Sequence, residues 1–356
     1  MLASAAVILA SCGGSTGESA TDRSTPVDST VGQPPATDPI ETTTSNVPAP
    51  TGLQLDKLPG RIAVTSTGCG NEFFSDLNVI CMYDPDGTNL VQVEAPGGYL
   101  AYLNWTWDGT KLLFDNDDSA WSVNADGTGL TTRDPYQVPM TSQSPDGRWS
   151  VGTRPLVASG YWLSPAGSPR SDRQWQQVTT DPNECCDFAR WSTDSRRLLY
   201  SVGFGPGVCG GLSSVDIDTR VVQVVIEPER SDAANPVCVV TESGRWSPDG
   251  SLVLFLDEGP NLDVTLNRPM VVNSDGTGLR PLIPDTLASD PSVLPTGWFA
   301  TAIAWSPDGT AIAMALVHDM GSGLYMISAD GSEVIEVTGL PIGAIPMDSM
   351  VWAPGL

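Results

Sequence analysis

Cysteine is the residue type in this chain of 356 residues whose side chains most clearly could form a metal site or disulfides. A zinc site would need Cys-x-x-Cys or histidine-containing spacings, and the adjacent Cys185 and Cys186 with the single His318 provide neither. An even set of cysteines can instead form disulfides in an oxidising compartment. Apart from Cys12, the candidates are Cys69, Cys81, Cys185, Cys186, Cys209 and Cys238. The sequence therefore predicts structural disulfides and an extracytoplasmic location.

Carboxylates dominate the charged side chains. Asp and Glu number 42 against 17 Lys and Arg, so the formal net charge is −25 at pH 7. Such a surface repels nucleic-acid phosphates and anionic lipid, and it attracts cations or a basic partner. It also keeps a secreted protein soluble. We therefore expect no nucleic-acid partner.

Ser-His-Asp catalysis is not indicated. Its general base would have to be His318, the only histidine, and no hydrolase domain accompanies the repeats described below. We interpret His318 as a residue at the end of a strand. The sequence therefore predicts a protein without catalytic residues.

Tight turns recur along the chain and define the elements that must position these side chains. The pattern Trp-Ser-Pro-Asp-Gly, followed by apolar residues, is intact at 246–250 and 305–309, and degenerate copies begin at 105, 143, 191 and 352. In this turn Ser occupies the first position, and Pro fixes the φ angle of the second position. Asp is compatible with the backbone conformation of the third position, and Gly adopts the left-handed conformation at the fourth. Each copy predicts an antiparallel hairpin, with its Trp in the core between repeats.

A second kind of turn alternates with the first. Its six copies occupy residues 84–87, 124–127, 164–167, 216–219, 273–276 and 328–331. Each unit then has four strands: A ends at the first turn, B follows it, C precedes the second turn, and D follows that turn. Six units in residues 60–356 have about 50 residues each, the size of a propeller blade.

The two ends of the repeat region complement each other. Residues 61–67 have the pattern of a B strand without a preceding A strand, and residues 348–352 that of an A strand without a following B strand. Pairing them completes the first blade and removes the open edges of the ring. The sequence predicts an all-β fold, a six-bladed β-propeller of four-stranded antiparallel blades closed by the C-terminal strand.

The motifs and their spacing resemble the WD-like repeats of TolB-like propellers and of the propellers attached to prolyl oligopeptidase-like peptidases. The resemblance covers about residues 60–356 and implies the fold, but one fold hosts many functions. TolB carries an extra α/β domain before its propeller, where this chain has a polar segment. A role in the Tol–Pal envelope system therefore does not transfer with the fold.

The beginning of the chain indicates a lipoprotein signal. Residues 1–11 form an apolar run without Lys or Arg, and Leu9-Ala10-Ser11-Cys12 at its end resembles a lipobox. Residues 13–59 are rich in Ser, Thr and Pro and poor in large apolar side chains, so they bury too little surface to order. We predict a signal peptide over 1–12, a disordered tether over 13–59, and a cell-envelope protein anchored to a membrane through lipid on Cys12.

Antiparallel strands place both kinds of short turn on one face of the ring, the turn face, and the longer B–C and D–A connections on the other, the loop face. Loops on a rigid scaffold often carry binding residues. On the loop face, carboxylates and aromatic rings could line a mouth for a cation or a basic peptide; ordinary loop carboxylates and core aromatics are the competing interpretation. The candidates are Tyr99, Tyr102, Asp115, Asp117, Asp118, Phe188, Asp257, Glu258, Trp298, His318 and Asp319.

The six remaining cysteines fall on the loop face as well. Cys69 and Cys81 flank one B–C hairpin, so we expect them to pair with each other. Cys209 and Cys238 lie in successive long loops, and they are expected to pair with each other or with Cys185 or Cys186.

The sequence thus predicts a monomeric, non-catalytic envelope scaffold that binds a protein, peptide or small ligand through its loop face. No cofactor is expected, although Ca²⁺ would suit an oxygen-rich cluster. Two alternatives stay open. One is a propeller enzyme of the glycosidase or lyase type that uses paired carboxylates, and the other is an extracytoplasmic sensor domain.

Overall fold

The computed structural model describes residues 52–66, 69, 79–96, 100–116, 119–133, 143–154, 158–166, 174–180, 184–203, 208–230, 237–240, 243–259, 267–319, 321–338, 340 and 350–353. All of them belong to one compact unit, Gly52–Leu356. Cys12 and residues 13–51 of the predicted tether lie outside them. No helix in these ranges is long and apolar enough to cross a membrane.

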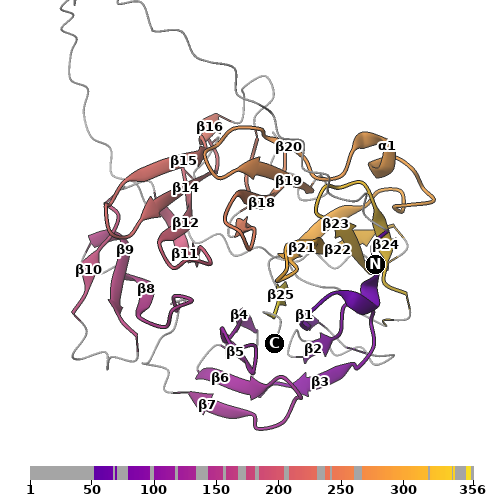
Figure 1. Cartoon of the computed structure of the whole chain (residues 1–356), viewed down its shortest axis with the longest axis horizontal. Helices are drawn as coiled ribbons and strands as arrows, with labels where there is room; N and C mark the ends of the chain where they lie inside the picture. Colours follow the sequence, from indigo (N-terminus) through magenta and orange to yellow (C-terminus); the bar gives the residue numbers. More distant parts are fainter. Residues whose placement is uncertain are drawn as a thin grey trace, which may run out of the picture. The chain divides into compact units, whose positions relative to one another are not determined.

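Six antiparallel sheets in the described ranges are the blades of a propeller (Figure 1). Blade 1 has the order β25 (Met350–Trp352), β1 (Ile62–Ser66), β2 (Val79–Tyr83) and β3 (Val91–Glu94). Blade 2 has β4 (Ala101–Trp105), β5 (Lys111–Asn116), β6 (Ser119–Asn124) and β7 (Thr131–Arg133). Blade 3 has β8 (Trp149–Arg154), β9 (Ala158–Pro165) and β10 (Gln176–Gln177), and a single bridge between Gln143 and Ser150 stands where its A strand is expected.

The second half of the ring repeats the same arrangement. Blade 4 has β11 (Glu184–Trp191), β12 (Arg197–Val202), β14 (Gly211–Asp216) and β15 (Val222–Ile226). Blade 5 has β17 (Arg245–Trp246), β18 (Leu252–Asp257), β19 (Arg268–Asn273) and β20 (Arg280–Pro281). Blade 6 has β21 (Phe299–Trp305), β22 (Ala311–His318), β23 (Gly321–Ser328) and β24 (Val334–Glu336). Outside the blades lie η1 (Leu55–Lys57), α1 (Asp285–Ala288) and a small sheet of β13 (Val208–Cys209) with β16 (Glu229–Arg230).

The ring closes where the end of the chain pairs with its first strand. β25 and β1 are antiparallel, with Ile62 opposite Trp352 and Val64 opposite Met350. The backbone N–H of Ala353 donates to the carbonyl of Arg61 at 2.7 Å, which continues this ladder. β25 also contacts β21 of blade 6 and β4 of blade 2. The predicted six-bladed propeller and its closure by the C-terminal strand are therefore confirmed.

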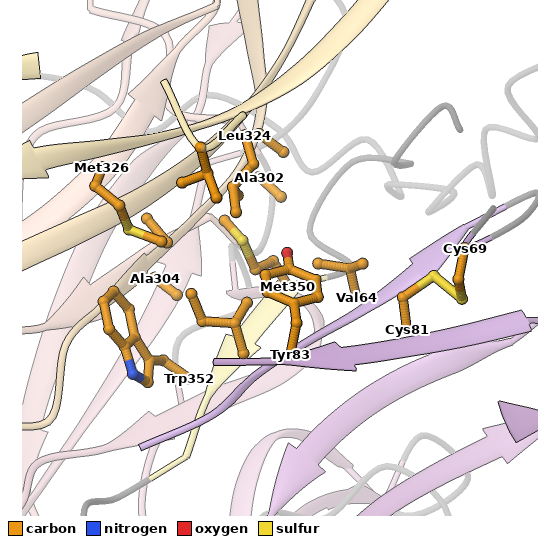
Figure 2. Packing of buried hydrophobic residues seen from close by; sticks show 14 of the residues in the cluster. Val64, Cys69, Cys81, Tyr83, Ala302, Ala304, Leu324, Met326, Met350 and Trp352 are labelled. Atoms are coloured by element: carbon orange, nitrogen blue, oxygen red, sulfur yellow. A yellow bond between two sulfur atoms is a disulfide. The ribbon is translucent and has the colours of Figure 1, made fainter. Parts of the chain in front are cut away.

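A buried cluster of side chains joins blade 6 to blade 1 across this closure (Figure 2). Tyr83 and Met350 are fully buried there, and Trp352 is 9% exposed. Small side chains on β21, Ala302 and Ala304, leave room for these larger ones. Burial raises the pKa of the Tyr83 phenol far above its usual range. The closure is therefore an apolar core as well as a ladder of hydrogen bonds.

Arg61 binds the closed blade to the next one. Its guanidinium donates to the carbonyls of Asn89 at 2.5 Å, Met82 at 3.3 Å and Ala125, the last of which lies in blade 2. Its Nε lies 3.4 Å from Asp84 Oδ1. Hydrogen bonds from a charged donor are stronger than those from a neutral donor. The Arg61 side chain therefore joins β2 and the following turn of blade 1 to a turn of blade 2.

Residues 52–59, which the sequence analysis assigns to the tether, pack on the propeller. The Trp352 indole donates to the carbonyl of Pro59 at 2.8 Å, and the backbone N–H of Leu53 donates to the Glu333 carboxylate at 2.5 Å. Three leucines supply the apolar contact with the closure cluster, namely Leu53, Leu55 and Leu58. Leucine at every second or third position gives this segment an apolar side that the polar residues before it lack.

The repeated Trp-Ser-Pro-Asp-Gly turn works as expected from its chemistry. In blade 5, the Ser247 hydroxyl donates to Asp249 Oδ1 at 2.6 Å and accepts from the Leu252 N–H at 2.9 Å. The hydrogen bond from Ser247, followed by those from Ser251, lowers the pKa of the Asp249 carboxyl. Equivalent Ser–Asp pairs occur in blades 3, 4 and 6, at Ser144, Ser192 and Ser306. The predicted position of the motif Trp in the core is also confirmed, since Trp246 and Trp305 are each 8% exposed.

In blades 5 and 6, the second kind of turn needs glycine because it packs on the neighbouring blade. Gly331 of blade 6 has φ +77°, and a Cβ there would lie 1.7 Å from the carbonyl oxygen of Leu282 in blade 5. Gly276 of blade 5 has φ +87°, and its Cβ would lie 3.1 Å from the carbonyl oxygen of Val225 in blade 4. The left-handed conformation and the close approach together exclude a side chain. These glycines set how closely successive blades stack.

Ser247→Ala is expected to lower the free energy of unfolding by about 1–2 kcal/mol, because it leaves the partly buried N–H of Leu252 without its acceptor. Urea denaturation followed by tryptophan fluorescence measures the change. Ser251→Ala is the matched control: Ser251 is exposed and donates to the same Asp249 carboxylate, so a loss of only a few tenths is expected. Equal losses in the two variants would contradict the role given to Ser247.

Candidate functional site

Only some of the predicted loop-face residues are among those that the structure describes. Tyr99, Asp117 and Asp118 lie outside the described residues, as do the side chains of Tyr102 in β4 and Phe188 in β11. Asp115 is placed near the end of β5, where it pairs with Ala120 of β6. The remaining candidates all lie on blades 5 and 6: they are Asp257, Glu258, Trp298, His318 and Asp319.

The carboxylate of Asp257, the last residue of β18, accepts hydrogen bonds from backbone N–H groups. Its Oδ1 accepts from the N–H of Cys238 at 2.8 Å and from the N–H of Gly259 at 3.0 Å. The Glu258 N–H donates in turn to the Cys238 carbonyl at 2.9 Å, and the Val240 N–H donates to the Leu256 carbonyl at 2.9 Å. The carboxylate of Asp257 therefore fixes the D–A connection of residues 237–240 against the end of β18.

A disulfide holds the same connection from its other side. Cys238 is bonded to Cys209 of β13, which lies in the B–C connection of blade 4 and pairs with Glu229 of β16. Cys69 and Cys81 form a second disulfide in blade 1. The predicted Cys69–Cys81 bond is confirmed, and Cys209 and Cys238 adopt one of the pairings left open. The side chains of Cys185 and Cys186 lie outside the described residues. Two disulfides indicate that the protein folds in an oxidising compartment.

Glu258 follows Asp257 and is about half buried. Burial raises the pKa of its carboxyl to about 7, and the nearby charge of Asp257 contributes in the same direction. A carboxyl of this kind exists in both protonation states near neutral pH. It can therefore give up or take a proton near neutral pH, where an ordinary surface carboxylate would already be ionised.

Trp298 is part of the core and does not stand in an open mouth. It is 7% exposed and packs with Leu294 and Leu316. Its indole donates to the carbonyl of Ala288, the last residue of α1, at 3.1 Å. The long D–A connection of residues 284–298 is therefore an ordered lid on the core of blade 6. Of the two interpretations of this residue, the core aromatic fits its position.

Arg268 lies beside Asp257 and Trp298 and was not among the candidates predicted from the sequence. It is opposite Asp257 in the β18–β19 ladder, and its guanidinium carbon lies 5.3 Å from the centroid of the Trp298 ring. A guanidinium at this distance from an aromatic face is attracted to it. Its place at the first residue of a C strand, after a long B–C connection, is the signal that could have indicated it.

Asp319 completes the group from the end of β22. It is exposed, and its carboxylate oxygens lie 3.1 and 3.2 Å from the position that a Cβ on Gly297 would take. Gly297, with φ +69°, thus lets the carboxylate approach the backbone beside Trp298. His318 precedes Asp319, is half buried and pairs with Gly321.

The described part of the loop face thus holds a set of residues at or beside strand ends of blades 5 and 6, which we name the blade 5–6 cluster. It combines a carboxyl of raised pKa, an exposed carboxyl and a guanidinium on an aromatic ring, and its members are Glu258, Arg268, Trp298 and Asp319. Within the described residues, no group of three or more His, Cys, Asp or Glu is arranged to hold a metal ion. Because Asp117 and Asp118 lie outside those residues, Ca²⁺ binding stays a prediction.

Comparison with models of protein families and with curated proteins finds no match. Among solved structures, the chain is similar to TolB from Acinetobacter baumannii, with a TM-score of 0.56 and 16% identity over 83% of this chain and 67% of that one. It is also similar to a putative TolB from Agrobacterium tumefaciens, with a TM-score of 0.51 and 15% identity over 83% of this chain and 99% of that one. An oligogalacturonate lyase from Vibrio parahaemolyticus aligns with a TM-score of 0.46 and 19% identity, over 67% of this chain and 64% of that one. At these identities the likeness to the TolB structures establishes the fold, which is that of a TolB-like propeller.

The raised pKa of Glu258 predicts a dependence of stability on pH. The folded protein keeps a proton on this carboxyl up to about pH 7, whereas the unfolded chain releases it near the ordinary value of 4.5. Between these values the folded state binds more protons, so the free energy of unfolding falls as the pH rises through this window. Glu258→Gln removes this titration, so the stability of the variant relative to wild type is expected to increase from about pH 5 to about pH 8. Urea denaturation at the two pH values measures this difference, and a difference independent of pH would contradict the burial of the carboxyl.

Proposed function

We propose that the protein is a binding scaffold of the bacterial cell envelope, which holds a protein or peptide partner through its loop face at the blade 5–6 cluster. The observation that carries this proposal is the position of Glu258 and Arg268 on a braced part of the loop face. Groups held in place before binding lose little conformational entropy when a partner arrives. A rigid propeller with such groups on its loop face has the properties of a scaffold.

The bracing comes from three separate contacts around the cluster. The Cys209–Cys238 disulfide joins two connections of blades 4 and 5, Asp257 binds the backbone of one of them, and the indole of Trp298 ties α1 to blade 6. A disulfide that closes a loop of 29 residues stabilises by about 3–4 kcal/mol in the chain-entropy account. The described connections of the loop face at blades 5 and 6 are therefore fixed to the strands beneath them.

Charge favours a basic partner. The net charge of −25 attracts cationic surfaces over distances of about 10 Å at moderate salt. Glu258 and Asp319 supply carboxylates in the cluster itself, and Arg268 supplies one site for a partner carboxylate or carbonyl. Mixed charges of this kind fix the orientation of a partner more than they raise its affinity.

The proposed location is the outer side of a membrane. The two disulfides are consistent with an oxidising compartment, and the fold is TolB-like. The lipobox ending at Cys12 supports lipid anchorage, with residues 13–51 as the connection between the anchor and the propeller. We infer that the loop face is presented to other envelope components.

One observation favours the enzymatic alternative. A carboxyl with a pKa of about 7 is suited to donate a proton near neutral pH, as a general acid does in glycosidases and lyases. Its neighbour Asp257 has its carboxylate bound by two backbone N–H groups, so the second carboxylate would have to come from elsewhere on the loop face. Hydrolysis or elimination on acidic oligosaccharides that is lost in Glu258→Gln would favour this alternative.

Affinity capture of envelope proteins from the producing bacterium tests the scaffold proposal. Asp319→Lys reverses an exposed charge in the cluster and is expected to reduce recovery of the wild-type partners by about tenfold. Quantitative mass spectrometry of the captured proteins measures the recovery. Asp218→Lys makes the same charge change on the turn face of blade 4 and is expected to leave recovery unchanged. Equal recovery with both variants and wild type would contradict binding at the blade 5–6 cluster.

A further inference from the structure

The outer strand of blade 4 differs from a typical outer strand of a soluble protein. Among the described strands, β15 pairs with β14 alone, so its other edge faces outward. Val221, Val222 and Val224 are 64%, 50% and 37% exposed. The run from Val221 to Ile226 contains no charged residue. It is therefore an exposed edge of high β propensity.

The outer strands of the other blades carry features that block pairing with another chain. Charged side chains, proline and short length are the usual devices. β3 and β24 end in Glu94 and Glu336, β7 ends in Arg133, β20 contains Pro281, and β10 has two residues. β15 has five residues and none of these devices. Blade 4 thus keeps open an edge that the other blades protect.

Blade 5 holds β15 in an extended form. The Gln223 side-chain amide donates to the carbonyl of Val224 at 2.9 Å and to the carbonyl of Asp275 in blade 5 at 3.3 Å. Gly276 packs against the carbonyls of Val224 and Val225. The strand is therefore ordered before any partner arrives, and adding a further strand to it would order the incoming chain alone.

The charges around the edge decide between possible occupants. Three carboxylates, those of Glu227, Glu229 and Asp275, are exposed near the ends of the strand, and the nearby chain carries two cations, Arg220 and Arg230. A second copy of the chain would bring the same acidic groups and a net charge of −25 to this edge, which opposes self-pairing. An extended segment with lysine or arginine between apolar residues matches both the valines and the carboxylates.

We propose that β15 is a docking edge for an extended cationic segment of a partner protein, which adds to blade 4 as a further strand. Main-chain hydrogen bonds along the edge supply affinity in this mode, and side chains at alternate positions supply specificity. The apolar side chains of the incoming segment cover Val222 and Val224. The basic side chains of that segment face Glu227, Glu229 and Asp275. This surface is separate from the blade 5–6 cluster.

Fluorescence anisotropy with the purified full chain and a labelled synthetic peptide of alternating lysine and valine tests the proposal. Binding is expected, and Val222→Lys is expected to weaken it by about tenfold or more, because lysine on an edge strand blocks pairing. Leu279→Lys is the matched control, since Leu279 in blade 5 is 40% exposed and lies outside β15; it is expected to leave binding unchanged. No binding by wild type, or equal weakening by Val222→Lys and Leu279→Lys, would overturn the proposal.

Two further peptides separate strand addition from simple charge attraction. The same peptide with N-methylated backbone amides lacks the donors of a β ladder, and the glutamate counterpart reverses its charge; both are expected to bind at least about tenfold more weakly. A photoreactive amino acid at position 222 of the full chain then identifies the occupant by mass spectrometry. Cross-links to the peptide support the proposal, whereas cross-links to a second copy or to residues 1–51 of the same chain would assign the edge to those occupants and overturn it.

Discussion

The pairing of β25 with β1 is the constraint on which the rest of the structure depends. Every blade is a small sheet that cannot bury its faces alone, so each relies on its two neighbours. Blade 1 receives its innermost strand from the other end of the chain, with Met350 opposite Val64. Without that strand, the core that Figure 2 shows around Tyr83 and Trp352 would open to solvent. The loop face is a continuous surface only while the ring is closed.

Local chemistry explains why the fold could be predicted from the sequence. The two kinds of turn depend on residues next to one another in the chain, such as Ser247 with Asp249 and Gly331 at its positive φ. Repetition of these local signals gave the number of blades, and the complementary ends gave the closure. Contacts between residues far apart in the sequence could not be predicted. Residue types alone did not determine that Cys209 pairs with Cys238, that Arg268 covers Trp298, or that β15 lacks the protection of the other outer strands.

The candidate site illustrates the same division between local and distant contacts. Asp257 and Glu258 are adjacent in the sequence, yet one is bound by the backbone N–H groups of Cys238 and Gly259 and the other has a raised pKa because it is partly buried. Their difference comes from the connection of residues 237–240, which folds back onto β18. Two surfaces with distinct chemistry result on one rigid ring. The blade 5–6 cluster is polar and braced on the loop face, and β15 is an apolar strand on the outer rim.

Native-state hydrogen exchange tests the closure of the ring most directly. If β25 and β1 are the contact on which the ring depends, the buried amides of Ile62–Ser66 in β1 open only with global unfolding. Their opening free energy, measured by exchange against denaturant, is then expected to equal that of the most protected amides in β18 and β22. Exchange of the β1 amides through an opening well below the global free energy, with the other blades still protected, would contradict the account, because the propeller would then persist without its closing strand.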